Sequence, residues 1–238
     1  MKQPQKGFTL IEIAIVLVII GLLLGGILKG QELINSARVR NLADSTSGIQ
    51  AAYFGFMDRY RKVPGDWKKS SADDAIGGTI NSGGNDNGRL DNSGDWTEPN
   101  ALWEHLSKAG FISGSYAGPG NVQPTTNNGA GPLNPFNSAM VVARSDHYQV
   151  SAGAASKRLL LIVGRGTPVD IARELDTKLD DSNPETGNLR SAEDATGPLT
   201  GSSDWDSGES GTCVNTAGTD AIWDVEKDSQ DCNAVFLF

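Results

Sequence analysis

The sequence predicts an α+β protein in which a long N-terminal helix, transmembrane in its first half, packs on a small antiparallel sheet and a disulfide closes a C-terminal loop. Three observations favour this fold class. Residues 8–28 form an apolar run, the helical spacing of apolar residues continues behind it, and short strand-like segments precede two cysteines near the C-terminus. The 238 residues suffice for one ordinary domain and an appendage.

The apolar run is long enough to cross a membrane. Apart from Thr9 and Glu12, residues 8–28 are apolar or glycine, and about 20 such residues span the hydrocarbon core of a bilayer as a helix. Lys2 and Lys6 precede the run and predict a cytoplasmic N-terminus. An ordinary secretory signal would have a shorter apolar region and a small-x-small cleavage site, which this run lacks. An uncleaved signal anchor with an incidental glutamate is the alternative.

The same helix is expected to continue into the soluble part of the chain. Apolar residues behind residue 28 recur at helical spacing, which places them on one face. Because the residue before a proline avoids the helical conformation, the helix should end near Lys62, shortly before Pro64. Residues 29–62 are therefore the amphipathic second half of the helix. Its apolar positions are Leu33, Ile34, Ala37, Leu42, Ile49, Ala52, Tyr53, Phe56, Met57 and Tyr60.

Residues 63–238 are expected to form a globular, periplasmic or extracellular domain. One helix is predicted over residues 98–109, stopped by Gly110, with Leu102, Trp103 and Leu106 toward the core. His105 on this helix is interpreted as a surface histidine or a satisfied interior one. Strands are predicted at residues 139–143, 147–151, 158–163 and 234–238, and the short connections among the first three favour antiparallel hairpins.

Another helix is predicted over residues 169–179. Thr167 is expected to cap it, with Pro168 at its first position. The acidic residues at its far end, Asp176, Asp180 and Asp181, are interpreted as a solvated helix terminus. The tryptophans are interpreted as core anchors, and sugar binding by an exposed one is the alternative.

Cys213 and Cys232 are expected to form a disulfide. The domain follows a membrane anchor and should lie outside the cytoplasm, where disulfides persist. Closing the loop of about 20 residues between the two cysteines would stabilise the fold by ~3 kcal/mol. Two unpaired thiols are the alternative. A zinc site is disfavoured because two thiolates are too few ligands and both histidines, His105 and His147, are distant in sequence.

One acidic, asparagine-rich loop resembles a calcium-binding segment. Oxygen-bearing side chains alternate before a glycine, and Ca²⁺ takes six to eight hard oxygen ligands around a sharp turn. An ordinary surface loop is the alternative, because no glutamate stands where an EF-hand would need its last ligand. No other cofactor is expected. The candidate ligands are Asn85, Asp86, Asn87, Asp91 and Asp95.

Composition and motifs disfavour two other function classes. The net charge of −9 argues against sequence-independent binding of nucleic acid or of anionic lipid head groups. No metalloprotease, nucleophile-elbow, P-loop or dinucleotide-binding motif occurs in the sequence. We therefore expect neither direct nucleic-acid binding nor an enzyme.

The segment Lys6-Gly7-Phe8-Thr9-Leu10-Ile11-Glu12 resembles the class III signal of type IV prepilins and pseudopilins. The resemblance implies that a prepilin peptidase removes residues 1–7 as a leader by cutting between Gly7 and Phe8, and then methylates the amine of Phe8. Glu12 becomes the fifth residue of the mature chain. The resemblance also implies a type IV pilin-like fold in which residues 8–28 serve as transmembrane and assembly helix.

The implied function is that of a structural subunit. The chain would be a minor pilin or pilin-like subunit of a type IV pilus, or of a related secretion (type II) or DNA-uptake filament. Its partners would be the prepilin peptidase, other pilin subunits and an inner-membrane assembly platform. It would wait in the inner membrane and then enter a periplasmic or cell-surface filament, aligned through Glu12. The alternative is an anchored binding or adhesion protein that never polymerises.

Overall fold

The structure is a computed structural model that describes residues 9–91, 95–124, 128–193 and 213–238. Its contacts divide the chain into two units, Met1–Arg38 and Val39–Phe238. Helix α1 (Leu10–Tyr60) begins in the first unit and ends in the second. The predicted continuous helix is confirmed, and its end at Tyr60 lies two residues before the predicted one.

The first unit presents an exposed apolar helix. Nearly all large apolar side chains of α1 up to residue 34 are exposed, from Leu10 to Leu33 and Ile34. The helix is long and apolar enough to cross a membrane, and none of its most apolar window is buried within the protein. The predicted stripe is therefore buried only from Val39 onward, where the second unit begins.

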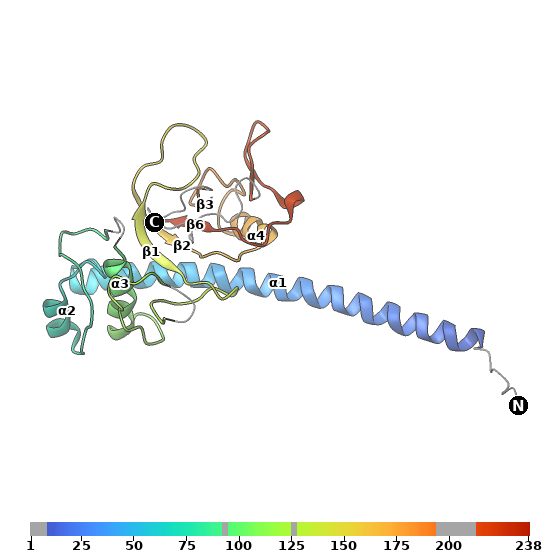
Figure 1. Ribbon diagram of the computed structural model, residues 1–238, viewed down its shortest axis with the longest axis horizontal. Helices are drawn as coiled ribbons and strands as arrows, with labels where there is room; N and C mark the ends of the chain where they lie inside the picture. The colour runs from blue at the N-terminus through green and yellow to red at the C-terminus, as the bar shows by residue number, and fades with distance from the viewer. Residues whose placement is uncertain (1–8, 92–94, 125–127, 194–212) are drawn as a thin grey trace, which may run out of the picture. The chain divides into compact units, whose positions relative to one another are not determined.

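The second unit is built around a four-stranded antiparallel sheet in the order β1-β2-β6-β3 (Figure 1). The register pairs Val142 with Leu161 and Leu161 with Phe236. A separate two-stranded sheet lies in the C-terminal loop. The strands are β1 (Val141–Ser145), β2 (Arg158–Ile162), β3 (Leu189–Ser191), β4 (Val214–Asn215), β5 (Ile222–Trp223) and β6 (Ala234–Leu237).

Both faces of the four-stranded sheet are covered. Val142 and Leu161 pack in a cluster with Ile49 and Phe56 of α1. The alternate strand positions, which point to the opposite face, form another cluster that also contains Tyr148 and is made of Val141, Ala143, Leu160, Ile162, Val235 and Leu237. This two-sided burial explains why the strands read as nearly continuous apolar runs.

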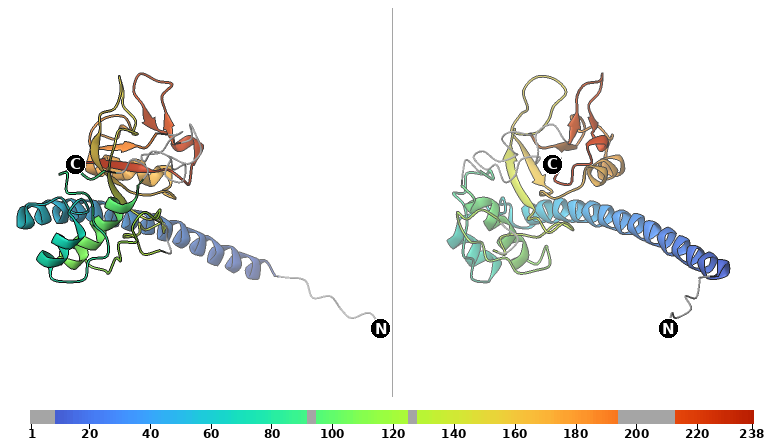
Figure 2. Two further views of the ribbon diagram at one scale, coloured as in Figure 1. Left: turned by 60° about the vertical axis from the view of Figure 1, so that its left-hand side comes forward. Right: turned by 45° about the vertical axis from the view of Figure 1, so that its right-hand side comes forward.

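Within this unit, residues 39–60 of α1 run between the sheet on one side and two shorter helices on the other (Figure 2). Helix α4 lies beside the sheet near the C-terminal loop, and a 3-10 turn follows β5. These elements are α2 (Lys69–Ile76), α3 (Thr97–Lys108), α4 (Val169–Leu179) and η2 (Val225–Lys227). The long helix, small antiparallel sheet and C-terminal disulfide agree with the predicted pilin-like α+β fold.

The predicted strand at residues 147–151 is wrong. Within this segment only Tyr148 forms an isolated β-bridge, which pairs it with Ala192. Strand β1 pairs directly with β2, and residues 147–151 lie in the connection between these two strands. These residues lie beside the three-residue strand β3, where the Gln149 N–H donates to the Ser191 carbonyl oxygen. The chain then turns at Gly153, whose φ is +78°. Helix α2 and the short strands β3, β4 and β5 were not predicted from the sequence.

The predicted cap at Thr167 is wrong as well. The residue that precedes α4 is Pro168, and no side chain caps this helix. The Thr167 hydroxyl instead donates to the carbonyl oxygen of Gly164, and its backbone pairs with Cys232. Thr167 thus joins the start of α4 to the disulfide loop rather than to its own helix.

Candidate functional site

The beginning of α1 is fixed by reciprocal hydrogen bonds between Thr9 and Glu12. The Thr9 backbone N–H donates to Glu12 Oε2 over 2.8 Å, and the Thr9 hydroxyl donates to the same oxygen over 2.7 Å. In return, the Glu12 backbone N–H donates to Thr9 Oγ1 over 3.3 Å. This arrangement is a capping box, which satisfies backbone donors that the first turn of a helix leaves unpaired.

The capping box was missed in the sequence analysis, although the Thr-x-x-Glu spacing before an apolar run is its ordinary signal. Both Thr9 bonds end on Oε2. The described residues offer Oε1 no partner, so this oxygen can accept a further donor. Glu12 itself is exposed. Gly7 and Phe8, the predicted cleavage and methylation positions, lie outside the described residues.

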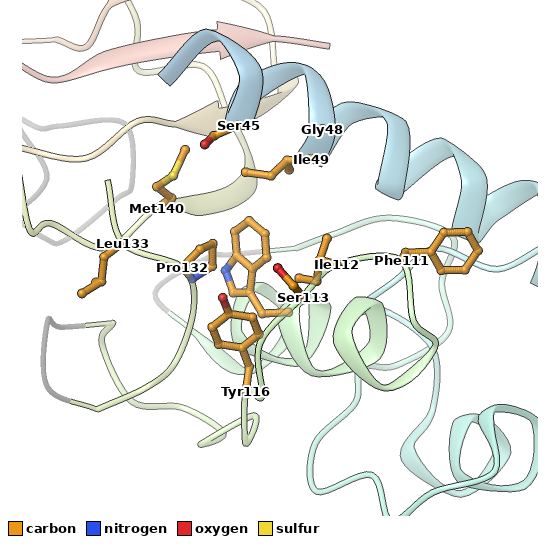
Figure 3. A pocket seen from close by; sticks show the side chains of 11 residues that line it. Ser45, Gly48, Ile49, Phe111, Ile112, Ser113, Tyr116, Pro132, Leu133 and Met140 are labelled. Atoms are coloured by element: carbon orange, nitrogen blue, oxygen red, sulfur yellow. The ribbon is translucent and has the colours of Figure 1, made fainter. Parts of the chain in front are cut away.

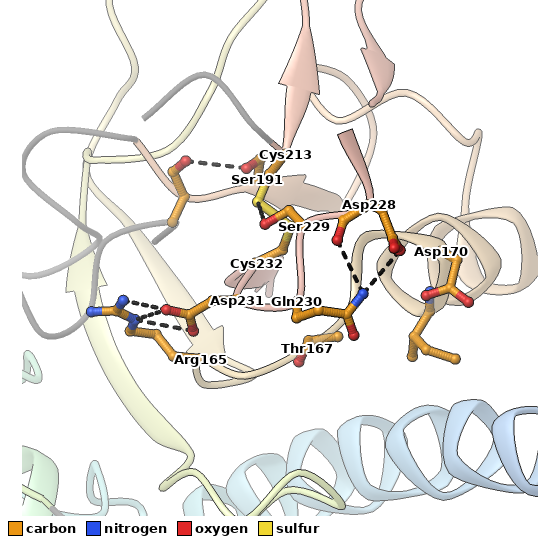
Figure 4. The surroundings of a disulfide bond; sticks show 12 residues. Arg165, Thr167, Asp170, Ser191, Cys213, Asp228, Ser229, Gln230, Asp231 and Cys232 are labelled. Carbon is orange, nitrogen blue, oxygen red and sulfur yellow. Dashed lines mark hydrogen bonds and ion pairs between the residues drawn. A yellow bond between two sulfur atoms is a disulfide. The ribbon is translucent and has the colours of Figure 1, made fainter. Parts of the chain in front are cut away.

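The predicted disulfide between Cys213 and Cys232 is confirmed, with the Cα atoms 5.8 Å apart. Hydrogen bonds fasten its loop to the segment that leads into α4 (Figure 4). The Cys232 N–H donates to the Thr167 carbonyl oxygen over 2.8 Å, and Asp231 pairs with Arg165 and accepts the Gly166 N–H. The loop is therefore an integral part of the globular unit.

A buried hydrogen bond ties the middle of the same loop to α4. The Trp223 indole N–H donates to Asp176 Oδ2 over 2.8 Å, and both side chains are almost fully buried. The interpretation of Asp176 as part of a solvated terminus is therefore wrong. Burial raises the pKa of Asp176 to about 6, against the opposing effect of the Trp223 hydrogen bond.

The neighbouring carboxylates organise the turn behind α4. Carboxylate oxygens of Asp176, Asp180 and Asp181 lie within 4.8 Å of one another, which is close enough for them to hold a metal ion together. However, they accept protein donors: Asp180 accepts the Leu189 N–H, and Asp181 accepts the Asn183 N–H. This cluster therefore closes a turn.

The five predicted calcium ligands lie in one loop but use their oxygens for protein contacts. Four of them accept hydrogen bonds from within the loop or from the start of α3. Asp86 pairs with Lys62, and Asp91 accepts the Asn87 side-chain amide over 2.6 Å. Asn85 accepts the Asn87 N–H, Asn87 accepts the Arg89 N–H, and Asp95 accepts the Thr97 N–H. A cation would have to replace these bonds, and calcium binding stays a prediction.

Buried carboxylates from outside the loop hold its backbone instead. Asp66 accepts the N–H groups of Asn87 and Gly88, at 3.0 and 2.7 Å. Glu98 accepts the Asp91 N–H over 2.6 Å. Glu104, which is fully buried, holds the segment before the loop: it accepts the Ser82 N–H over 3.0 Å and lies 3.4 Å from the Lys108 ammonium. The loop is thus ordered by side chains of α3 and of the turn before α2.

His105 is confirmed as a satisfied interior histidine. Its Nδ1 accepts the Gly65 N–H over 3.0 Å, which fixes the proton on Nε2, and Nε2 faces the Ser82 carbonyl oxygen at 3.2 Å. Burial lowers the pKa of His105 to about 4. The neutral ring therefore joins α3 to Gly65 and Ser82 throughout the physiological pH range.

The Glu98→Gln variant should respond differently to pH from the natural protein. Burial raises the pKa of Glu98 from 4.5 to about 7, so the folded chain binds more protons than the unfolded chain between these values. Ionisation of Glu98 therefore removes stability as the pH rises through this window. We expect the free energy of unfolding of Glu98→Gln, relative to the natural protein, to increase with pH there.

Urea unfolding at about pH 5 and about pH 8 measures this difference. His105 and Asp176 also titrate, but they are present in both proteins and their effects cancel in the comparison. A difference that does not change with pH would contradict the role of Glu98.

Comparison with known proteins gives one match. The family model described as the prokaryotic N-terminal methylation motif matches residues 2–28. No curated protein and no solved structure matches the chain. The matched segment contains the Thr9–Glu12 capping box and most of the exposed apolar part of α1.

Proposed function

We propose that this chain is a minor or pilin-like filament subunit. It carries the N-terminal signal of the type IV pilins and pseudopilins, and it is a pilin-like protein processed by prepilin peptidase. The filament would be a type IV pilus or a related secretion or DNA-uptake filament. The observation that carries this proposal is the methylation motif at residues 2–28, placed at the start of an exposed apolar helix that can cross a membrane once.

The proposed mechanism uses a charge that processing creates. Cleavage after Gly7 would free the amine of Phe8, which can pair with Glu12 of a neighbouring subunit. Both charges would lie among apolar helices, where an unpaired carboxylate is costly and a paired one much less so. Apolar helix packing would supply cohesion, and the ion pair would select the alignment at which it can form.

The free Glu12 oxygen supports this mechanism. The capping box occupies Oε2 within the same chain, whereas the described residues leave Oε1 without a donor. One carboxylate can thus hold the start of its own helix and accept the amine of a neighbour. The capping box also holds Thr9 in position to begin the helix, directly after the proposed new N-terminus.

The proposed minor role rests on the length of the chain. Removal of residues 1–7 would leave 231 residues, which is long for the bulk subunit of such a filament. The C-terminal disulfide favours type IV pilins over secretion pseudopilins. The globular unit would stand in the periplasm or on the cell surface, where its disulfide persists.

Intact-mass measurement of the chain from its own host tests processing. We expect a mass that lacks residues 1–7 and carries one additional methyl group on Phe8. A bulky substitution, Gly7→Leu, should leave the full-length chain uncut, and Gly7→Ala is the milder control. A natural chain that keeps its leader would instead favour the anchored, non-polymerising binding protein.

A further inference from the structure

The sequence contains two Asn-Gly pairs, Asn87-Gly88 and Asn128-Gly129. Such a pair can react within itself, because glycine has no side chain to hinder the approach of its backbone nitrogen to the asparagine Cγ. A bond forms between these two atoms, the Cγ–Nδ2 bond breaks, and Nδ2 leaves as ammonia with the proton of the glycine N–H. Water then opens the cyclic imide at either carbonyl, which leaves aspartate or isoaspartate.

The side chains of the two asparagines make similar contacts with the backbone that follows them. Asn87 Oδ1 accepts the Arg89 N–H over 2.9 Å, and Asn128 Oδ1 accepts the Ala130 N–H over 3.2 Å. Each side chain therefore folds back over the peptide bond that would attack it. These contacts do not distinguish the two sites.

The peptide bonds of the first pair are held by a buried carboxylate. Asp66 accepts the Asn87 N–H over 3.0 Å with Oδ1 and the Gly88 N–H over 2.7 Å with Oδ2. Only 1% of Asp66 is exposed, so water scarcely competes for these bonds. Ring closure requires the Gly88 nitrogen to turn toward Asn87 Cγ, and the two hydrogen bonds oppose this rotation. The folded chain therefore protects Asn87.

The second pair lacks such a carboxylate. Gly129 is exposed and has a φ of +62°. No residue in the described ranges accepts its backbone N–H. The Gly129 nitrogen can therefore turn onto Asn128 Cγ without breaking a hydrogen bond of its own.

We propose that Asn128 is a site of spontaneous modification, converted to aspartate and isoaspartate through the Gly129 nitrogen, whereas Asp66 keeps Asn87 as asparagine. The reaction needs only water. It goes beyond filament formation and depends neither on cleavage nor on Glu12. Neither product returns to asparagine, so the converted fraction would increase with the age of an exported chain.

Conversion would change the segment that follows. Asn128 Nδ2 donates to the Gln123 carbonyl oxygen over 2.7 Å, and a carboxylate cannot make this bond. Isoaspartate would also lengthen the backbone two residues before the fully buried Ala130. The same segment continues into Pro132 and Leu133, which line a pocket of about 330 Å³ between α1, α3 and the segment before β1 (Figure 3). We therefore expect the modification to alter one wall of this pocket.

Peptide mass spectrometry of the full mature chain in detergent micelles tests the proposal. The protein is incubated at mildly alkaline pH, and conversion at both asparagines is followed in the same sample. We expect Asn128 to convert at least about tenfold faster than Asn87, because a hydrogen bond to a charged acceptor must open before Gly88 can react. Chromatography should separate isoaspartate from aspartate at position 128, since opening of the imide gives both.

The unfolded chain is the matched control. In concentrated urea both asparagines precede a glycine without tertiary contacts, so their rates should become similar. Equal rates in the folded protein, or a difference that persists in urea, would overturn the proposal. So would the formation of aspartate without isoaspartate at position 128, because direct hydrolysis of the amide would then be the reaction.

Two variants assign the rates to the named residues. Asn128→Gln should abolish the fast conversion, because the longer side chain closes a less favourable ring. Asp66→Asn weakens the hydrogen bonds that hold the first pair and should speed the conversion of Asn87. An Asn87 rate that is the same in Asp66→Asn and in the natural protein would contradict the protective role of Asp66.

Discussion

Glu12→Gln is expected to leave cleavage and membrane insertion intact and to prevent filament assembly. The substitution removes the negative charge that would pair with the Phe8 amine of a neighbouring subunit. Within bundled apolar helices, that amine would then be buried without a counter-ion, which is strongly unfavourable. Filaments sheared from cells and counted by electron microscopy, together with the intact mass of the membrane-bound chain, measure the two outcomes separately.

Glutamine distinguishes the ion pair from the capping box. Its amide oxygen can still accept the Thr9 hydrogen bonds that Glu12 Oε2 accepts in the natural chain. Glu12→Ala removes both the charge and the cap, whereas Thr9→Ala removes the capping hydroxyl and keeps the charge. We therefore expect Glu12→Gln and Glu12→Ala to fail alike and Thr9→Ala to assemble.

The opposite pattern would contradict the proposed mechanism. If Glu12→Gln forms normal filaments while Thr9→Ala and Glu12→Ala do not, Glu12 acts as a helix cap and not as an ion-pair partner. Normal filaments from all three variants would show that Glu12 has no role in assembly.

Replacing Cys213 and Cys232 by serine together is expected to lower the free energy of unfolding by about 3 kcal/mol. The disulfide closes a loop over a sequence separation of 19 residues, and a loop of this size restricts the unfolded chain by about that amount. Urea unfolding followed by tryptophan fluorescence measures the loss. Reduction of the natural protein with dithiothreitol should reproduce it.

The loop should stay attached to the folded protein without its disulfide. The buried Trp223–Asp176 hydrogen bond and the Arg165–Asp231 pair still join it to α4 and to the segment before α4. We therefore expect Asp176→Leu in the serine background to cost more than it costs alone. An unfolding midpoint that does not change on reduction would contradict a stabilising disulfide.

Several features could be predicted from the sequence because they depend on neighbouring residues. The span of α1, the bounds of α3 and α4 within one residue, and the pairing of Cys213 with Cys232 follow from apolar spacing, proline positions and cysteine count. The Thr9–Glu12 capping box was equally local and could have been recognised from its spacing. The match at residues 2–28 rests on such local information too.

Other features depend on contacts between distant segments. Residues 147–151 have a strand-like pattern, but in the folded chain only Tyr148 forms a bridge, to Ala192 next to β3, so the pairing and not the pattern decided their structure. Thr167 resembles a helix cap, yet the disulfide loop takes its backbone. Asp176 sits at a helix end that looks solvated, and Trp223, distant in sequence, buries it.

The sequence by itself therefore determined the membrane-spanning helix, its processing signal and the disulfide, because hydrophobic length, local motif and cysteine pairing need no knowledge of the fold. Only the tertiary structure decided how the acidic loop is held. Asp66 in the turn before α2 and Glu98 on α3 both accept backbone N–H groups of this loop. It also decided that Gly48 and Trp103 border one pocket, because α1, α3 and the segment before β1 meet only when the chain folds.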